Sequence, residues 1–337
     1  MTRRSTPLLL AAGLFAVGGC GAGDATTIGE PVFALDRDVA AQIADAPADR
    51  GAVMAAFDLR LLLQSLLTDH ATLSNEAMRR AIDGGAIDST LAALTDNTDQ
   101  LTLAMGIVYG PSGANAFDQL WTNHIEFFNT YARAIAAGDT QGAQEATDAL
   151  DHYEHDFSDF VDVATVGELG FETVLHVLHS HVDQLLLQAD LWDRADHEAA
   201  IEVADEAFRH MDTIAAALAG AIAAQQPAVF PGDVDDPGRA ICSAARLDVA
   251  AWIVARADVS AARRLGPGGY LDAAVSALEV AETAGAAWLE PAERESLDVA
   301  FSDFEDDDDP TTVRSRVLGE VLPAVTSSSC ASVVGRG

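Results

Sequence analysis

The sequence predicts an all-α protein: a six-helix bundle of three repeated helical hairpins, followed by a smaller C-terminal helical domain. Long stretches rich in Ala, Leu, Glu, Gln and Arg have helical periodicity, and no proline interrupts residues 48–110 or 112–226. Alternating runs typical of β-hairpins are absent from the sequence. Histidines recur at His70, His124 and His181, at spacings of 54 and 57 residues, which indicates a repeated supersecondary unit.

Residues 1–19 have the pattern of a signal peptide. Arg3 and Arg4 give a positive start, and the apolar run at 8–17 is too short to cross a bilayer. The run ends in Val17-Gly18-Gly19-Cys20, which resembles the lipobox of bacterial lipoproteins. The resemblance implies cleavage before Cys20, lipidation of its thiol, and a lipid-anchored place on the extracytoplasmic face of the cell membrane. The alternative is an ordinary secretory signal. Residues 20–50 would then hold the lipidated Cys20 and a tether.

Residues 51–226 form the predicted bundle. We expect helices at 52–82, 88–109, 114–137, 140–163, 168–193 and 197–225. The breaks between them contain glycines that accept a left-handed conformation, such as Gly84, Gly110 and Gly138. Asp139 and Asp196 are placed to cap the helices that follow them.

The segment 227–238 is rich in Pro, Gly and Asp and is typical of a domain linker. Residues 239–330 then predict a helical domain with about four helices, including 240–257 and 269–286. Once Cys20 is lipidated, Cys242 and Cys330 remain as an even pair in an oxidising compartment. We expect a disulfide between them, contributing ~3–4 kcal/mol, the alternative being two free thiols. The acidic run 305–310 lacks the Gly and final Glu of a calcium-binding loop.

The charge is strongly negative. The chain has a net charge of −34 and no lysine, and loss of Arg3 and Arg4 with the signal would bring it to −36. Such a surface repels the phosphates of nucleic acid, so we expect no nucleic-acid partner. It would attract metal ions or a cationic partner, although a merely solvated surface is the simpler interpretation. The sequence names no protein or small-molecule partner.

Four histidines lie on apolar helix faces, where a polar ring is unexpected: His70, His124, His181 and His210. His181 comes about 14 residues before its turn and His210 about 15 after it, so both lie about 21 Å from that turn. The same count predicts three level pairs across the hairpins: His70/Asn97, His124/Tyr153 and His181/His210. His152, His155 and His176 have polar neighbours and are expected on the surface.

These pairs allow three interpretations. In the first, buried His, Asn and Tyr side chains bond to one another and fix helix register. In the second, His70, His124, His181 and His210 bind a transition metal as neutral imidazoles, with Tyr153 beside them. In the third, Trp121, Phe127, Phe128 and Tyr153 line a haem or small-molecule pocket. The metal site requires that the hairpins close into one bundle and do not stack as an open solenoid.

No catalytic motif is present in the sequence. Glu-x-x-His pairs of di-iron bundles, His-Glu-x-x-His, Cys-x-x-Cys and phosphate-binding glycine loops are all missing. The favoured function is therefore non-enzymatic: a surface binding or interaction lipoprotein with a buried layer of histidines.

Residues 59–230 also resemble, loosely, an uncharacterised family of secreted all-helical bacterial proteins. The likeness rests on the stretches Leu66–His70, Val108–Gly110, Leu120–Phe128 and His210-Met211. It implies a defined module and supplies no activity.

Overall fold

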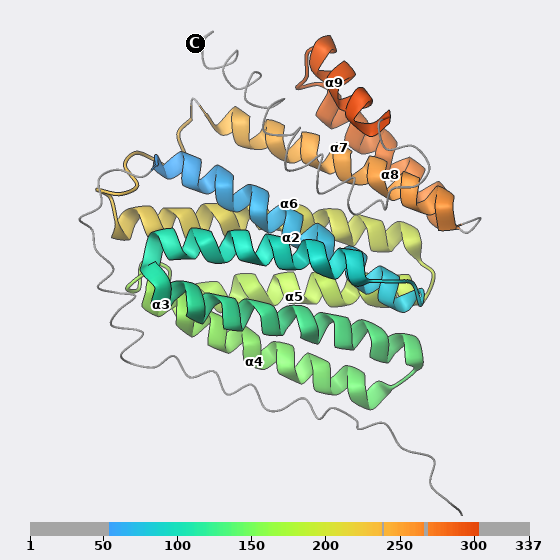
Figure 1. Ribbon diagram of the computed structural model, residues 1–337, viewed down its shortest axis with the longest axis horizontal. Coiled ribbons are helices and arrows are strands. Elements are labelled where there is room, and N and C mark those ends of the chain that lie inside the picture. Colours follow the sequence, from blue (N-terminus) through green and yellow to red (C-terminus); the bar gives the residue numbers. More distant parts are fainter. Residues whose placement is uncertain (1–53, 238, 266–268, 303–337) are drawn as a thin grey trace, which may run out of the picture.

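The computed structural model describes residues 54–237, 239–265 and 269–302. Every regular element in these ranges is a helix, which confirms the all-α prediction. The elements are α2 (Ala56–Ile82), α3 (Asp88–Ala137), α4 (Thr140–Ala164), α5 (Phe171–Asp193), α6 (His197–Gln225), α7 (Ala240–Leu265), α8 (Gly269–Ala286) and α9 (Pro291–Ser302). The helices α2 to α6 lie side by side, and α7 to α9 lie against one side of them (Figure 1).

The long helix α3 folds back on itself at Gly110. Gly110 has φ 73° and ψ −174°, a left-handed φ that glycine adopts without strain. The hydroxyl of Thr102 lies 3.4 Å from a carboxylate oxygen of Asp118, so residues equally far from Gly110 meet across the two halves. The sequence placed a break at 110–113. In the structure the second half is already helical at Pro111, where proline is favoured as the first residue of a helix.

The turns between the next helices follow the predicted chemistry. Gly138 ends α3 in the left-handed region with φ 68°. The carboxylate of Asp139 then accepts a hydrogen bond from the Gly142 amide at 3.0 Å, which caps α4. Asp196 caps α6 in the same way. These turns make α3, α4, α5 and α6 successive packed neighbours, and α2 packs on both α3 and α6.

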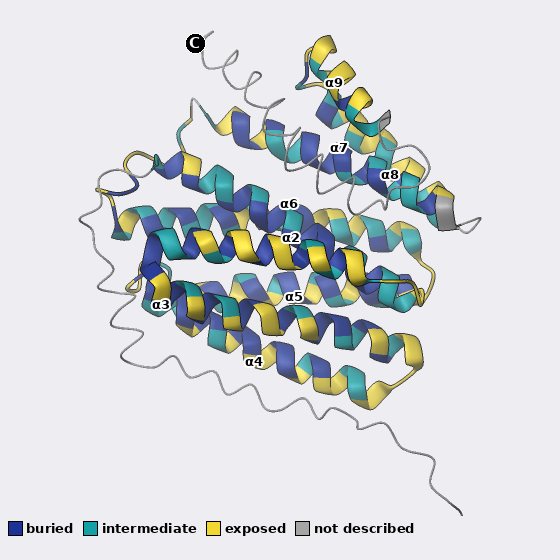
Figure 2. Cartoon of the chain, in the orientation of Figure 1, coloured by how far each residue is buried: buried dark blue, intermediate teal, exposed yellow. Residues whose placement is uncertain are grey.

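One hydrophobic core runs through α2 to α6. Apolar side chains from all five helices belong to it, and Figure 2 shows their buried faces turned toward one another. The segment predicted as a linker also contributes, because Val229 and Phe230 are buried in this core. The amide of Ala56, at the start of α2, donates to the Pro231 carbonyl at 2.9 Å. Residues 229–231 are therefore packed onto helices α2 to α6, which we call the body, and they are not a free connector.

The helices α7, α8 and α9 have a second, smaller core around Val249, Trp252 and Ile253. Phe208 of α6 belongs to this core too, so the C-terminal helices share apolar packing with the body. Gly285 of α8 lies against Trp252, where an added Cβ would come within 3.0 Å of the Trp252 Cβ. That close approach explains a glycine in the last turn of α8.

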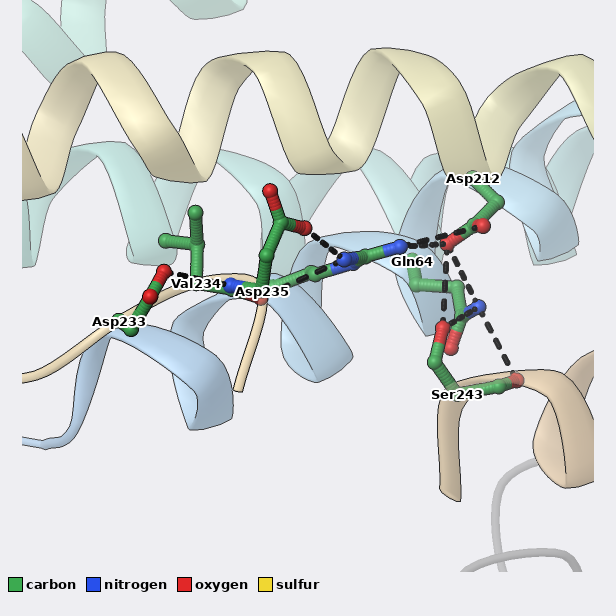
Figure 3. Close-up of polar contacts among 7 residues, drawn as sticks. Gln64, Asp212, Asp233, Val234, Asp235 and Ser243 are labelled. Atoms are coloured by element: carbon green, nitrogen blue, oxygen red, sulfur yellow. Dashed lines mark hydrogen bonds and ion pairs between the residues drawn. The ribbon is translucent and has the colours of Figure 1, made fainter. Parts of the chain in front are cut away.

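A polar cluster joins α2, α6 and α7, and we call it the seam network: Arg60, Gln64, Asp212 and Ser243 (Figure 3). The amide of Gln64 donates to Asp212 at 2.8 Å and to the Ser243 hydroxyl at 2.8 Å. Ser243 also lies 3.3 Å from Asp212, and Arg60 forms an ion pair with the same carboxylate at 3.3 Å. Each member has at least one partner within the network, which fixes α7 against the body.

Several sequence predictions lie outside the described residues: the signal at 1–19, Cys20 and its tether, the acidic run 305–310, and Cys330. Cys242 is buried, but because Cys330 lies outside the described ranges the disulfide stays a prediction. Within residues 54–302, leaving aside the short masked gaps, no helix has the length and apolar character needed to span a bilayer.

Candidate functional site

The buried histidines meet at the centre of the body. His70 on α2 and His124 on the second half of α3 have their Nε2 atoms 3.1 Å apart, so one ring donates a hydrogen bond to the other. Both side chains are buried, 1 % and 4 % exposed. The Ser74 hydroxyl lies 3.4 Å from His70 Nε2, at the limit of hydrogen bonding.

Trp121 and Tyr153 hold these two rings in place. The Trp121 ring is 4.6 Å from the ring of His70 and 4.7 Å from that of His124, measured between centroids. Tyr153 of α4 stacks on His124 with a centroid distance of 4.6 Å and an interplanar angle of 11°. The predicted pair His124/Tyr153 is thus present, with the rings packed face to face.

The other two predicted pairs are also present. Asn97 lies beside His70, and its amide donates to the Leu66 carbonyl at 2.9 Å. His181 of α5 stacks on His210 of α6, with ring centroids 6.4 Å apart and planes 12° apart. His210 Nε2 donates to the Val177 carbonyl at 3.1 Å, so this nitrogen already has a partner.

Three of the four histidines converge on one small cavity. His70, His124 and His181 line it together with Tyr153 and Trp121, and its volume is about 30 Å³. His210 does not line it. We call His70, His124, His181 and Tyr153 the histidine cluster. The cavity has room for a water molecule or a single ion, because one water needs about 10–15 Å³ of this volume.

Polar atoms of the histidine cluster lack hydrogen-bond partners. They are the Nδ1 atoms of His70, His124 and His181 and the hydroxyl of Tyr153. Asn97 lies near His70 and the Trp121 carbonyl lies near His124, but neither contact reaches ordinary hydrogen-bond geometry with Nδ1. His181 Nδ1 and the Tyr153 hydroxyl are therefore the least satisfied atoms. A buried polar atom without a partner costs about 1–3 kcal/mol, which marks the cluster as costly for structure alone.

Burial keeps all three imidazoles neutral. It lowers the pKa of His70 well below its usual value, and the neighbouring His124 lowers it further. Burial likewise brings the pKa of His124 to about 3 against the opposing effect of the Trp121 carbonyl, with His181 adding to the shift. The pKa of His181 also falls to about 3, through burial and then through His70 and His210. A neutral imidazole is the form that binds a metal ion.

The cluster is not arranged as a finished metal site. Among the described residues, no three His, Cys, Asp or Glu groups have donor atoms around a common point. The two Nε2 atoms 3.1 Å apart are nevertheless about as far from each other as two nitrogen ligands at ~2.0–2.1 Å from one tetrahedral ion. His181 lines the same cavity, and its Nδ1 has no hydrogen-bond partner.

Sequence reasoning missed Glu154, which is buried next to Tyr153. Its Oε2 accepts a hydrogen bond from His179 Nδ1 at 2.9 Å. Burial raises the pKa of Glu154 to about 7, although His179 acts in the opposite direction, and the pKa of His179 is raised by Glu154 in return. The signal was available in the sequence, because Leu150, Glu154, Phe157 and Val161 share the spacing of one inward helix face.

The surface assignments of the other histidines are confirmed, since His152, His155 and His176 are exposed. Comparison with known proteins adds no name to the site: no family model, no curated protein and no solved structure matches the chain.

Proposed function

We propose that the chain is an extracytoplasmic lipoprotein, anchored by lipid on Cys20, whose helical body is a non-enzymatic binding module. The lipobox-like Val17-Gly18-Gly19-Cys20 supports the anchor, and the lack of catalytic motifs in the sequence supports a binding role. We further propose that residues 51–226 are three repeated hairpins closed into one six-helix bundle. The folding back of α3 at Gly110 and the three level pairs support that organisation.

The ligand that the histidine cluster fits best is one first-row transition-metal ion. The observation that carries this is the convergence of three buried neutral imidazoles on one cavity of about 30 Å³. Imidazole nitrogens suit Zn²⁺, Cu²⁺ and Ni²⁺. His70, His124 and His181 would be the ligands, and Tyr153 would stand beside the ion. His210 is left out because its Nε2 donates to a backbone carbonyl.

The other two interpretations fit less well. Sites for haem-sized and drug-sized molecules have volumes of about 300–1,000 Å³, far above the cavity between these rings. Polar packing that only sets helix register does not account for four unpaired polar atoms gathered around one cavity, although unpaired buried atoms also occur elsewhere among the described residues.

Metal analysis of the purified protein tests the proposal. The full mature chain carrying Cys20→Ser, which removes the need for detergent, is incubated with Zn²⁺, Cu²⁺ or Ni²⁺, desalted and analysed for bound metal. We expect one tightly held ion, and loss of that ion in a His124→Ala/His181→Ala variant. The matched control is His152→Ala/His176→Ala, which removes two exposed histidines from α4 and α5. No retained metal, or equal loss in both variants, would contradict the metal proposal.

The lipid anchor has its own test. Replacing Cys20 by Ser removes the thiol that would carry the lipid, so the protein should move from the membrane fraction to the soluble extracytoplasmic fraction. The measurement is cell fractionation followed by detection of the protein, with Cys242→Ser as the control. Unchanged membrane retention of the Cys20 variant would defeat the anchor and leave the metal proposal untouched.

A further inference from the structure

A large groove separates α6 from the C-terminal helices, on a different face of α6 from the histidine cluster. Residues of α2, α6, α7 and α8 line it, and its volume is about 550 Å³. We call it the α6–α8 groove. Its size falls in the range of sites that bind small organic molecules.

The floor of the α6–α8 groove is apolar. Ala251 and Ala255 of α7 and Ala277 and Ala281 of α8 line it, together with Phe208 of α6. Alanine side chains end one carbon from the backbone, so they cannot fill the space between the helices. The groove is thus a consequence of alanine-rich faces on α7 and α8, and it offers a surface for a hydrocarbon group.

One wall of the groove is acidic. Glu198, Glu202 and Glu206 recur every four residues on α6, which places them in one row along the groove. All three are exposed, and none forms an ion pair with another of the described residues. The two arginines of the groove are already paired, Arg209 with Asp205 at 2.9 Å and Arg79 with Asp258 at 3.4 Å.

A buried amide supplies an independent sign of a ligand. Asn75 of α2 lines the groove and is only 4 % exposed, yet its Oδ1 atom accepts no hydrogen bond. A buried carbonyl oxygen without a donor is costly. As the side chain stands, this oxygen is closed to solvent, so the Asn75 amide would have to turn before an N–H or O–H group of a molecule in the groove could donate to it.

We propose that the α6–α8 groove binds an amphipathic organic cation, with its ammonium group at Glu198, Glu202 and Glu206 and its hydrocarbon body on the alanine-lined floor. Charge selects this ligand, because three unpaired carboxylates attract a cation and repel an anion. The same charge disfavours the chain's own residues 305–309 as occupant, since all five of them are acidic. The proposal does not depend on metal at the histidine cluster.

The test uses a fluorescent amine and its uncharged twin. Dansylcadaverine carries a primary ammonium on a five-carbon chain, and N-pentyl dansylamide has the same body without it. Titration of each into the full mature Cys20→Ser chain, followed by dansyl emission, should show saturable one-to-one binding of the amine. We expect the uncharged twin to bind about tenfold more weakly, as the loss of several exposed charge contacts implies.

Two variants locate the site. Changing Glu198, Glu202 and Glu206 together to Gln should weaken amine binding about tenfold and leave the uncharged twin unaffected. Ala277→Phe should weaken both probes by filling the floor. The matched control changes three exposed glutamates elsewhere, Glu126, Glu168 and Glu172, to Gln. Circular dichroism confirms that each variant is folded. Absence of saturable binding, equal binding of the two probes, or equal loss in the control variant would overturn the proposal.

Discussion

The body contains two polar clusters that differ in how far their side chains are paired. Every side chain of the seam network bonds to another member, although Arg60 Nε and Gln64 Oε1 have no partner. In the seam network, Gln64 Nε2 has two short hydrogen bonds, and Asp212 is shared by Arg60, Gln64 and Ser243. In the histidine cluster only the bond between His70 and His124 has ordinary geometry. The difference separates polar groups that hold helices together from polar groups that remain available to a ligand.

The two clusters also differ in charge. The seam network keeps ionised groups near the surface, where the Asp212 side chain is 26 % exposed. The histidine cluster lies deeper and consists of neutral groups, because burial lowers the pKa of each imidazole. Desolvation explains both arrangements. A charged side chain far from water must be paired with an opposite charge or become neutral. Three measurements of unfolding free energy can therefore test the difference between the two clusters.

The largest expected effect is a pH dependence that belongs to the histidine cluster. His124 and His181 have pKa values of about 3 in the folded chain and about 6.5 when unfolded, so only the unfolded state takes up protons between these values. Their stabilising effect is complete above pH 6.5 and is lost as the pH falls toward 3. Between pH 7.5 and 5, each should cost about 2 kcal/mol of unfolding free energy, or about 4 kcal/mol together.

Urea denaturation of the metal-free protein at both pH values measures this loss. A His124→Phe/His181→Leu variant should lose about 4 kcal/mol less than the wild type over the same interval. The pair Glu154/His179 and His70 also titrate here, but they are present in both proteins. They cancel in the difference except for the part of the His70 shift that His124 causes. If the unfolding free energies of wild type and variant had the same pH dependence, the histidine cluster would not be its source, and the contrast with the seam network would be lost.

The next effect is expected in the seam network. Gln64→Ala removes a buried side chain and its bonds to Asp212 and Ser243, so we expect a loss of about 2–3 kcal/mol in unfolding free energy at pH 7.5. Urea denaturation provides the measurement. The matched control is Gln144→Ala on the exposed face of α4, which should change stability by less than about 0.5 kcal/mol. A Gln64 variant no less stable than this control would mean that the seam network contributes little.

The level pairs of the histidine cluster could be predicted from the sequence, whereas the seam network could not. The level pairs could be predicted because the rise per residue of a helix is fixed, so a count from each turn places His124 beside Tyr153 and His181 beside His210. The bounds of α8 could also be predicted, since a glycine-rich stretch at 266–269 begins it and Pro291 follows soon after its end. These features depend on one hairpin or one helix at a time.

The remaining features depend on how distant segments pack. Convergence of His70 with His124 and His181 requires α2, α3 and α5 to close around one point, which local periodicity does not specify. Gln64 meets Ser243 across 179 residues of sequence, and neither residue is unusual in its own helix. The α6–α8 groove likewise appears only when alanine faces from two helices are set against α6.

The smallest expected effect sharpens the comparison inside the histidine cluster itself. His181→Leu removes a ring whose Nδ1 has no partner, and a leucine of similar volume can pack against Leu178 and Met211. We expect the unfolding free energy of the metal-free protein at pH 8 to change by less than about 1 kcal/mol, because no hydrogen bond is lost. The matched variant His70→Leu breaks the bond to His124 Nε2 and should cost about 1–3 kcal/mol. Urea denaturation of both variants measures the difference. If His181→Leu proved as costly as His70→Leu, His181 would be part of the packing that holds the helices together, and the idea of a ring kept free for a ligand would fall.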